Sequence, residues 1–285
     1  MFEMFLVVAA LVHQPVPGHH AAAVHSIPLV CDARSSLIVP VSVQGAAPRP
    51  FLLDTGASIT TIDERLSQRL GLTMVGRIPS WTGTDPLVVA QLTVGATQLP
   101  PGPIAVADLA RLSRLVGDVA GILGSDALRG MGHVTIDYDR CTLTIGANVE
   151  DLAVPGSSRR VPIEWHEGRP VVTLSGGGRL LLDSGATTVT VFSGGAAASG
   201  VSFATGAGSL VRIDRVDGSR IGRAGRLACL SIGGVNQYNV PAVGVRSWYG
   251  KDDIHAPDGL LPLGLFSRVH ITRSGGYVVL VPRSH

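Results

Sequence analysis

Lysine is almost absent from this 285-residue chain, in which Lys251 is the only lysine among 23 basic residues. Those basic residues face 21 acidic ones, so the formal net charge is only +2. Proteins that bind nucleic acids or membrane surfaces by charge usually carry a strongly basic patch or stripe. The charge balance gives no reason to expect a nucleic-acid partner.

Charged residues are also scarce, at 15%, whereas hydrophobic residues reach 45% and the mean hydropathy is +0.34. Disordered chains combine low hydrophobicity with high net charge, so this composition predicts a folded chain with a sizeable core. The 36 glycines and 18 prolines separate short runs of valine, leucine and isoleucine. That distribution indicates many strands and turns and excludes an all-helical protein.

Long hydrophobic runs are missing, and the apolar run at residues 4–12 is too short to cross a bilayer. Small residues at 21–23 follow it, as at the cleavage sites of export signals. We therefore expect residues 1–30 to be a signal or leader segment, the protein to be exported to the periplasm or secreted, and the mature chain not to insert stably in a membrane. Glu3 stands where a signal usually carries positive charge, so an unstructured or misassigned start is the alternative.

Cysteine is scarce as well, and three residues, Cys31, Cys141 and Cys229, leave at least one thiol unpaired. Their spacing matches no zinc pattern, and no histidine pair has the spacing of a zinc-protease helix. We predict neither a metal nor a cofactor. Pairing of Cys31 with Cys141 stays open at this point.

The chain repeats one motif. Residues 51–58 read Phe-Leu-Leu-Asp-Thr-Gly-Ala-Ser, and residues 180–187 read Leu-Leu-Leu-Asp-Ser-Gly-Ala-Thr. The two aspartates, Asp54 and Asp183, are 129 positions apart, and each motif is followed later by a Leu-Gly pair, at 123–124 and at 263–264. A matched order of early and late markers indicates a duplicated domain.

Local patterns predict how each half is built. Residues 40–43 with 51–53, and 170–174 with 180–182, read as hairpins whose second strand is buried on both faces. Residues 63–70 read as a short helix with Asp63 at its N-cap and Gly71 at its C-cap, and residues 193–200 as a weaker equivalent. Residues 87–94, 134–145 and 269–281 alternate as strands do. We expect one lobe at 31–148, a linker at 149–158 and a second lobe at 159–285.

An aspartate at the end of a buried strand, followed by Thr/Ser-Gly, has a specific chemical use. Glycine allows a tight turn and a close approach of the backbone. Two such turns meeting at a pseudo-twofold axis would bring Asp54 and Asp183 together. Because adjacent carboxylates cannot both ionise easily, they would share one proton. One could then activate a water molecule while the other protonates a carbonyl oxygen.

These two motifs resemble the active-site motifs of aspartic proteases, and the Ile122-Leu123-Gly124 and Pro262-Leu263-Gly264 segments resemble the signature that accompanies them. The short lobes and the helix ending at Gly71 are closer to retropepsin-like bacterial aspartyl proteases. The resemblance covers about residues 37–282. It implies an all-β, bilobal pepsin/retropepsin-like fold with the cleft between two β-barrel-like lobes.

The resemblance also implies roles for single residues and a partner. Asp54 and Asp183 would be the catalytic pair of an aspartic-type endopeptidase. Supporting residues would be Thr55, Gly56, Ser184 and Gly185. The substrate would be a protein or peptide, and a single chain carrying both motifs predicts a monomer.

Two features depart from the family pattern. Neither expected flap segment matches a known flap sequence; we place these segments near residues 80–84, with Trp81 and Gly83 as candidates, and near 205–208, with Gly206. Trp81 would either cover the cleft or be a buried strand aromatic. Ala57 and Ala186 stand where pepsin-like enzymes usually have serine or threonine. Loss of a hydroxyl donor should raise the pKa values of the pair, which predicts activity at mildly acidic to near-neutral pH.

Two other functions stay open. A catalytically silent protein could bind peptides, or assemble, through the same cleft. Glycoside hydrolysis by paired carboxylates would need the groups roughly 5 Å or more apart.

Five arginines lie between residues 212 and 226. They predict a solvated hairpin, with binding of an acidic ligand as the alternative.

Overall fold

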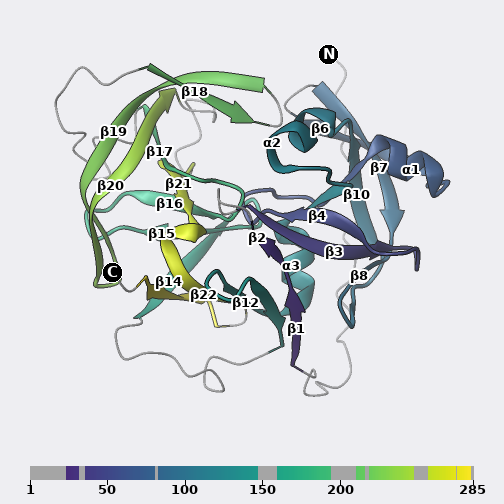
Figure 1. The fold of residues 1–285 in the computed structure, drawn as a ribbon, viewed down its shortest axis with the longest axis horizontal. Helices are drawn as coiled ribbons and strands as arrows, with labels where there is room; N and C mark the ends of the chain where they lie inside the picture. The colour runs from purple at the N-terminus through teal and green to yellow at the C-terminus, as the bar shows by residue number, and fades with distance from the viewer. Residues whose placement is uncertain are drawn as a thin grey trace, which may run out of the picture.

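The protein is an all-β molecule in which two sheets meet along a shared junction (Figure 1). The computed structural model describes residues 24–31, 36–80, 83–146, 159–193, 210–215, 218–246, 256–273 and 275–283. The expected all-β fold class is confirmed. None of the helices in these ranges is both long enough and apolar enough to cross a membrane.

Within the described ranges, the first sheet is built from the first half of the chain and lies on the right of Figure 1. Its strand order is β6-β7-β10-β5-β11-β4-β3-β8-β9, with β2 pairing β3. The strands are β2 (Val30–Cys31), β3 (Leu37–Val43), β4 (Arg49–Leu53), β5 (Thr61–Asp63), β6 (Met74–Ser80), β7 (Gly83–Ala90), β8 (Leu92–Val94), β9 (Thr97–Gln98), β10 (Gly102–Ala107) and β11 (Gly121–Leu123).

The second sheet draws strands from both halves, in the order β1-β13-β12-β22-β23-β14-β15-β16-β21-β17-β20-β19-β18. Its strands are β1 (His25–Pro28), β12 (His133–Asp137), β13 (Thr142–Ile145), β14 (Arg159–His166), β15 (Arg169–Thr173), β16 (Arg179–Asp183), β17 (Val189–Ser193), β18 (Leu210–Arg215), β19 (Gly218–Ile232), β20 (Val235–Arg246), β21 (Gly259–Pro262), β22 (Phe266–Thr272) and β23 (Tyr277–Pro282).

The internal repeat is visible in the pairing of the buried strands. β4 pairs with β3 on one side and runs parallel to β11 on the other. β16 likewise pairs with β15 and runs parallel to β21. Strands with neighbours on both sides and apolar residues on both faces are interior strands. The two hairpins predicted at 40–53 and 170–182 are thus confirmed.

Short helices lie beside the first sheet. α1 (Glu64–Arg69) begins after Asp63, whose carboxylate accepts a hydrogen bond from Arg65 N at 3.0 Å, as predicted for an N-cap. Leu70 is the C-cap and Gly71 follows it with φ +63°. Two helices were not predicted: α2 (Ala110–Val116) and α3 (Ser125–Met131), the latter starting directly after the first Leu-Gly pair.

Strands predicted as continuous are interrupted. The segment 87–94 divides at Gln91 into β7 and β8, and 134–145 and 269–281 each fold back as a hairpin, β12–β13 and β22–β23. Alternation of polar and apolar residues persists through a tight turn, so it does not reveal where a strand reverses. The predicted linker 149–158 and most of the predicted helix 193–200 lie outside the described residues.

The two halves share one junction. β12, from the first half, pairs with β22, from the second, and one apolar core cluster runs through both sheets. A disulfide joins Cys31 of β2 to Cys141 of the β12–β13 turn, with Cα atoms 5.9 Å apart.

β1 pairs with β13 although β1 lies inside the predicted leader, so a cleaved leader compatible with this fold would end before His25. The domain boundaries themselves stay predictions.

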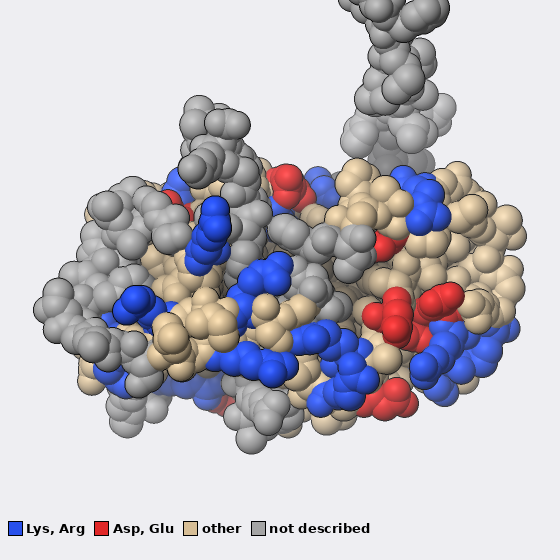
Figure 2. Space-filling model, turned by 90° about the horizontal axis from the view of Figure 1, so that it is seen from above, with Lys and Arg blue, Asp and Glu red and all other residues tan. Residues whose placement is uncertain are grey.

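Basic side chains gather on part of one face of the molecule. Figure 2 shows arginine side chains gathered on the face that is uppermost in Figure 1, where the β18–β19 hairpin lies. This hairpin holds the arginines that predicted a solvated hairpin, and that prediction is confirmed. Arg111 of α2 donates a hydrogen bond to Ser219 Oγ of β19 at 2.6 Å, which connects the two halves on this face.

Candidate active site

Two aspartates come to the junction because equivalent strands end there. Asp54 follows β4 and Asp183 is the last residue of β16. β4 presents Phe51, Leu52 and Leu53 to the interior, so the strand is held by burial up to the position of the carboxylate. Asp54 N also donates to Leu123 O of the parallel strand β11 at 3.0 Å. The carboxylates thus emerge from rigid elements.

Hydroxyl groups tie the two turns to each other. Thr55 N donates to Ser184 Oγ at 3.0 Å, and Ser184 N donates to Thr55 Oγ1 at 3.0 Å. Each hydroxyl then donates to the strand of the other half: Thr55 Oγ1 to Leu182 O at 2.7 Å and Ser184 Oγ to Leu53 O at 2.8 Å. Both side chains are buried. This reciprocal set of four bonds fixes the distance between the two motifs.

Main-chain amides orient each carboxylate. Gly56 N and Ala57 N donate to Asp54 Oδ1 at 2.8 and 3.2 Å. Gly185 N and Ala186 N donate to Asp183 Oδ1 at 2.8 and 3.0 Å. Donors of this kind favour the ionised form of a carboxyl group. Ala57 and Ala186 therefore hold the carboxylates through their main-chain N–H groups. The residue type alone does not predict this role.

Each glycine of the motif lies against the carboxylate of the opposite half. A Cβ atom at Gly56 would be 2.6 Å from Asp183 Cγ, and one at Gly185 would be 2.8 Å from Asp54 Cγ. Real Cβ atoms do not approach so closely, so no larger residue fits without displacing an aspartate. The sequence predicted a tight turn here, whereas the structure shows that the space is needed by the partner carboxylate.

The surroundings of the two carboxyl groups raise the pKa of each, and that of Asp183 more strongly. Burial raises the pKa of Asp54, although hydrogen bonds from Gly56, Asp183 and Ala57 and the charge of Arg169 lower it. Burial raises the pKa of Asp183 well above its usual range, and the charge of Asp54 raises it further. A hydrogen bond joins the two carboxyl groups. Two neighbouring carboxyl groups whose pKa values are both raised favour a state in which the pair holds one proton.

Hydrogen bonds from the first Leu-Gly segment and the start of α3 support the turn that holds Asp54. Thr60 Oγ1 donates to Asp126 Oδ1 at 2.7 Å and accepts from Gly124 N at 3.1 Å. Ser125 N, the first residue of α3, donates to Ala57 O at 2.8 Å. These contacts connect the Leu-Gly segment to the turn that holds Asp54. Sequence reasoning missed Thr60, Ser125 and Asp126, because nothing in their spacing singles them out.

The symmetry is incomplete at the second Leu-Gly pair. There the chain forms a single 3-10 turn, η2 (Leu263–Leu265), instead of a helix like α3. Asp258, just before β21, connects to the start of β16: its Oδ2 accepts from Arg179 N at 2.9 Å. Its counterpart in the first half, Asp118, is exposed. The two halves repeat their dyad turns more faithfully than their flanks.

The predicted flap segments are only partly described. β6 and β7 form an antiparallel hairpin with Ser80 opposite Gly83, where φ is +128°. Trp81, between these strands, and Gly206, in the second predicted flap, lie outside the described residues. Their roles stay predictions. Within the described ranges, no three His, Cys, Asp or Glu residues are grouped so as to hold a metal ion.

Comparison with known proteins agrees with this geometry. Residues 39–127 match the family described as aspartyl protease, a range that contains the first dyad motif and the first Leu-Gly pair. Among solved structures, the fold is similar to that of the aspartic proteinase from Irpex lacteus, with a TM-score of 0.54. That match covers 92% of this chain and 98% of the other at 14% identity. No curated protein matches the chain.

Proposed function

We propose that this chain is an active aspartic endopeptidase that uses Asp54 and Asp183, a proposal supported by the family match over residues 39–127 and by the fold. The observation that carries the proposal is the pair itself. Two hydrogen-bonded carboxyl groups of unequal acidity are held by the reciprocal bonds of Thr55 and Ser184. Such a pair offers a base and an acid at one point, which amide hydrolysis requires.

The proposed reaction begins with one proton on the pair. Asp54, the ionised member, takes a proton from a water molecule as the water oxygen bonds to the carbonyl carbon of the substrate. Asp183 gives its proton to the carbonyl oxygen, which forms a neutral tetrahedral diol. Asp54 then returns a proton to the amide nitrogen, the carbon–nitrogen bond breaks, and Asp183 recovers its proton from a hydroxyl of the diol.

The pH range of activity is part of the proposal. Activity requires one ionised and one protonated carboxyl, so it falls when Asp54 is protonated at low pH and when Asp183 ionises at high pH. Both pKa values are raised by burial. This direction supports a window that lies at mildly acidic to near-neutral pH. Ala57 and Ala186 contribute no hydroxyl donor that would oppose it.

The direct hydrogen bond between the carboxyl groups argues against glycoside hydrolysis. The carboxyls of glycosidases lie roughly 5 Å or more apart, because a sugar or a water molecule must fit between them. A pair that shares a proton leaves no such space. A polypeptide is therefore the proposed substrate.

Location and assembly also belong to the proposal. The disulfide between Cys31 and Cys141 supports export, since disulfides persist in oxidising compartments. Both members of the catalytic pair come from one chain, so a monomer would suffice for catalysis.

The test is cleavage of a diverse peptide library between pH 3 and 8, read by mass spectrometry. Wild type is compared with Asp54→Asn and Asp183→Asn, which keep the shape of each side chain but remove its acid–base function. We expect wild-type cleavage, which also reveals the sequence preference, and its loss in both variants. Circular dichroism should show that all three proteins are folded.

Other results would change the assignment. A folded wild type that binds library peptides without cutting them would identify a catalytically silent binding protein. Cleavage that survives both substitutions would come from a contaminant or from another site.

A further inference from the structure

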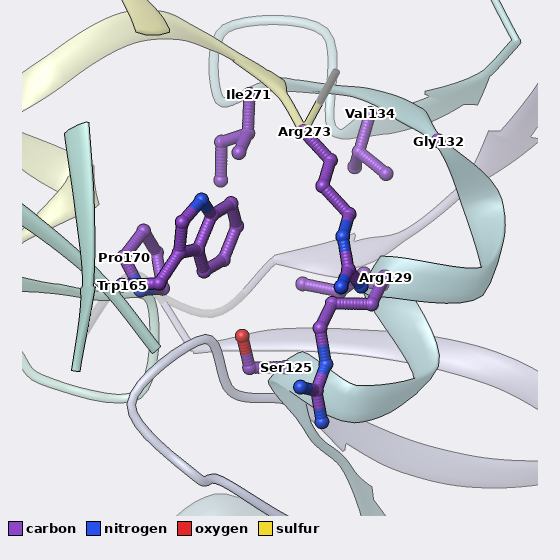
Figure 3. A pocket seen from close by; sticks show the side chains of 9 residues that line it. Ser125, Arg129, Gly132, Val134, Trp165, Pro170, Ile271 and Arg273 are labelled. Carbon is purple, nitrogen blue, oxygen red and sulfur yellow. The ribbon is translucent and has the colours of Figure 1, made fainter. Parts of the chain in front are cut away.

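A pocket lies at the lobe junction, apart from the catalytic pair. It is enclosed by α3 of the first half and by the β14–β15 hairpin and the end of β22 of the second. The hollow is shallow and opens to solvent at its mouth. Figure 3 shows Arg273 extending beside Arg129, with the ring of Trp165 facing them. The site therefore draws residues from both halves of the chain.

The charge in this pocket is unbalanced. The described residues that line it include Arg129 and Arg273 but no aspartate or glutamate. The nearby acids are engaged elsewhere: Glu167 pairs with Arg169, and Asp126 accepts from Thr60 Oγ1. Burial lowers the pKa of Arg273, and the charge of the neighbouring Arg129 lowers it further. An anion bound between them would relieve this repulsion.

Each arginine has a neighbour on the β14–β15 hairpin. Ser125 Oγ donates to Gly168 O at 2.8 Å, which fixes α3 against the β14–β15 turn. At that turn a Cβ atom on Gly168 would lie 2.8 Å from Arg129 Nη1, so the backbone passes directly against the guanidinium. Arg273 lies over the ring of Trp165, 6.0 Å from its centroid. Preorganised guanidinium groups bind oxyanions with little further loss of freedom.

The rest of the pocket wall is apolar. Its apolar lining consists of Leu128, Val134, Trp165, Pro170 and Ile271. Trp165 is 37% exposed, so the pocket is open to solvent on that side. A bare inorganic ion would leave this wall in contact with water. A ligand with an anionic head and an apolar body would cover both parts.

We propose that this pocket is a binding site for a carboxylate that carries an apolar group. The carboxylate would lie between the guanidinium groups of Arg129 and Arg273, and the apolar group would lie against Trp165 and Ile271. Two sources share this chemistry, a free organic acid and the C-terminus of a peptide that ends in an apolar residue. The proposal does not depend on the catalytic pair.

The experiment measures binding by calorimetry on the full chain, with N-acetylphenylalanine as the carboxylate and its carboxamide as the uncharged control. We expect saturable binding of the acid and affinity at least about tenfold weaker for the amide. Arg129→Gln and Arg273→Gln should each weaken binding of the acid by about tenfold or more, because each removes one charged donor. Trp165→Ala should weaken it by a smaller factor.

A matched variant controls for net charge. Arg49→Gln removes the same charge at an exposed position of β4 outside the pocket and should bind like wild type. Arg273 is exposed, so its variant tests the site even if substitution of the half-buried Arg129 impairs folding.

A final comparison separates the two sources. A pentapeptide ending in phenylalanine should bind more tightly than N-acetylphenylalanine if the occupant is a peptide terminus, and no more tightly if it is a free acid. The proposal is overturned if no acid binds, if acid and amide bind equally, or if Arg273→Gln leaves the affinity of the acid unchanged.

Discussion

Two pairs of titratable residues bridge the halves of this molecule, and they differ in how their polar atoms are satisfied. In the aspartate pair, each carboxylate accepts two main-chain hydrogen bonds and the two groups share a proton. In the histidine pair, His133 of β12 stacks on His270 of β22 with ring centroids 6.1 Å apart. Thr135 Oγ1 lies 2.6 Å from His270 Nδ1, but His133 Nδ1 and His270 Nε2 are buried without a hydrogen-bond partner among the described residues.

The two pairs respond to acid in opposite directions. Burial raises the pKa values of both aspartates, so the folded state holds protons that the unfolded chain releases, and this stabilising effect is lost as the pH rises. Burial, with the neighbouring His133, lowers the pKa of His270 to about 4. Here the unfolded chain takes up a proton first, so stability is lost as the pH falls from about 6.5 to about 4. The comparison teaches that burial favours the protonated form of the aspartates but the neutral form of His270, so the histidine pair makes the fold less stable in acid.

The largest effect should come from the aspartates. Asp54→Asn or Asp183→Asn should lower kcat/KM by about 10³-fold or more, since each removes a general acid or base. Asp183→Asn should also make the protein more stable at pH 8, because a buried group of raised pKa no longer has to ionise. Peptide cleavage and urea unfolding measure the two effects. If either variant were as active as wild type, the catalytic role proposed for that aspartate would be wrong.

The next effect concerns the histidines. Between pH 7 and pH 4.5 we expect wild type to lose up to about 3 kcal/mol of unfolding free energy through His270, and His270→Gln to lose much less over the same range. Urea titrations at several pH values measure this. His25→Gln, at the edge of the same sheet, is the matched control and should keep the wild-type slope. Parallel slopes for wild type and His270→Gln would show that this pair has no part in acid sensitivity.

A glycine of the motif gives a sharper test of geometry. Gly56→Ala should reduce kcat/KM by about 100-fold, since its methyl group would intrude on the Asp183 carboxyl and misplace it. Gly76→Ala is the control, because nothing lies within 4 Å of a Cβ atom there and its φ is not positive. Steady-state kinetics on the two variants should differ clearly. Equal activities would mean that the close approach at Gly56 is not needed.

The smallest effect should be a shift of the pH profile. Ala57→Ser adds a hydroxyl donor next to Asp54, which favours the ionised carboxylate and lowers its pKa. The acidic limb of kcat/KM should then move to lower pH by about half a unit to one unit, with little change at the optimum. A shift toward higher pH would contradict the assignment of the acidic limb to Asp54.

Several features of this site could be predicted from the sequence because they depend on local residues. The strand, aspartate, hydroxyl residue and glycine follow one another directly, so the turn and its chemistry can be inferred from eight letters. The Asp63 cap of α1 is equally local. The contacts of Thr60, Ser125 and Asp126 could not be predicted, because each joins segments more than 60 residues apart and none belongs to a repeated pattern.

The sequence by itself determined the class of fold, the duplication and the identity of the two aspartates, since strand burial and turn formation depend on neighbouring residues. The tertiary structure decided how burial raises the pKa values of both aspartates, why a Cβ atom is excluded at Gly56 and Gly185, and that Cys31 pairs with Cys141. It also decided that Arg129 and Arg273 meet in one pocket. Acidity, close approach and charge balance depend on distances between remote segments, and those distances exist only once the chain is folded.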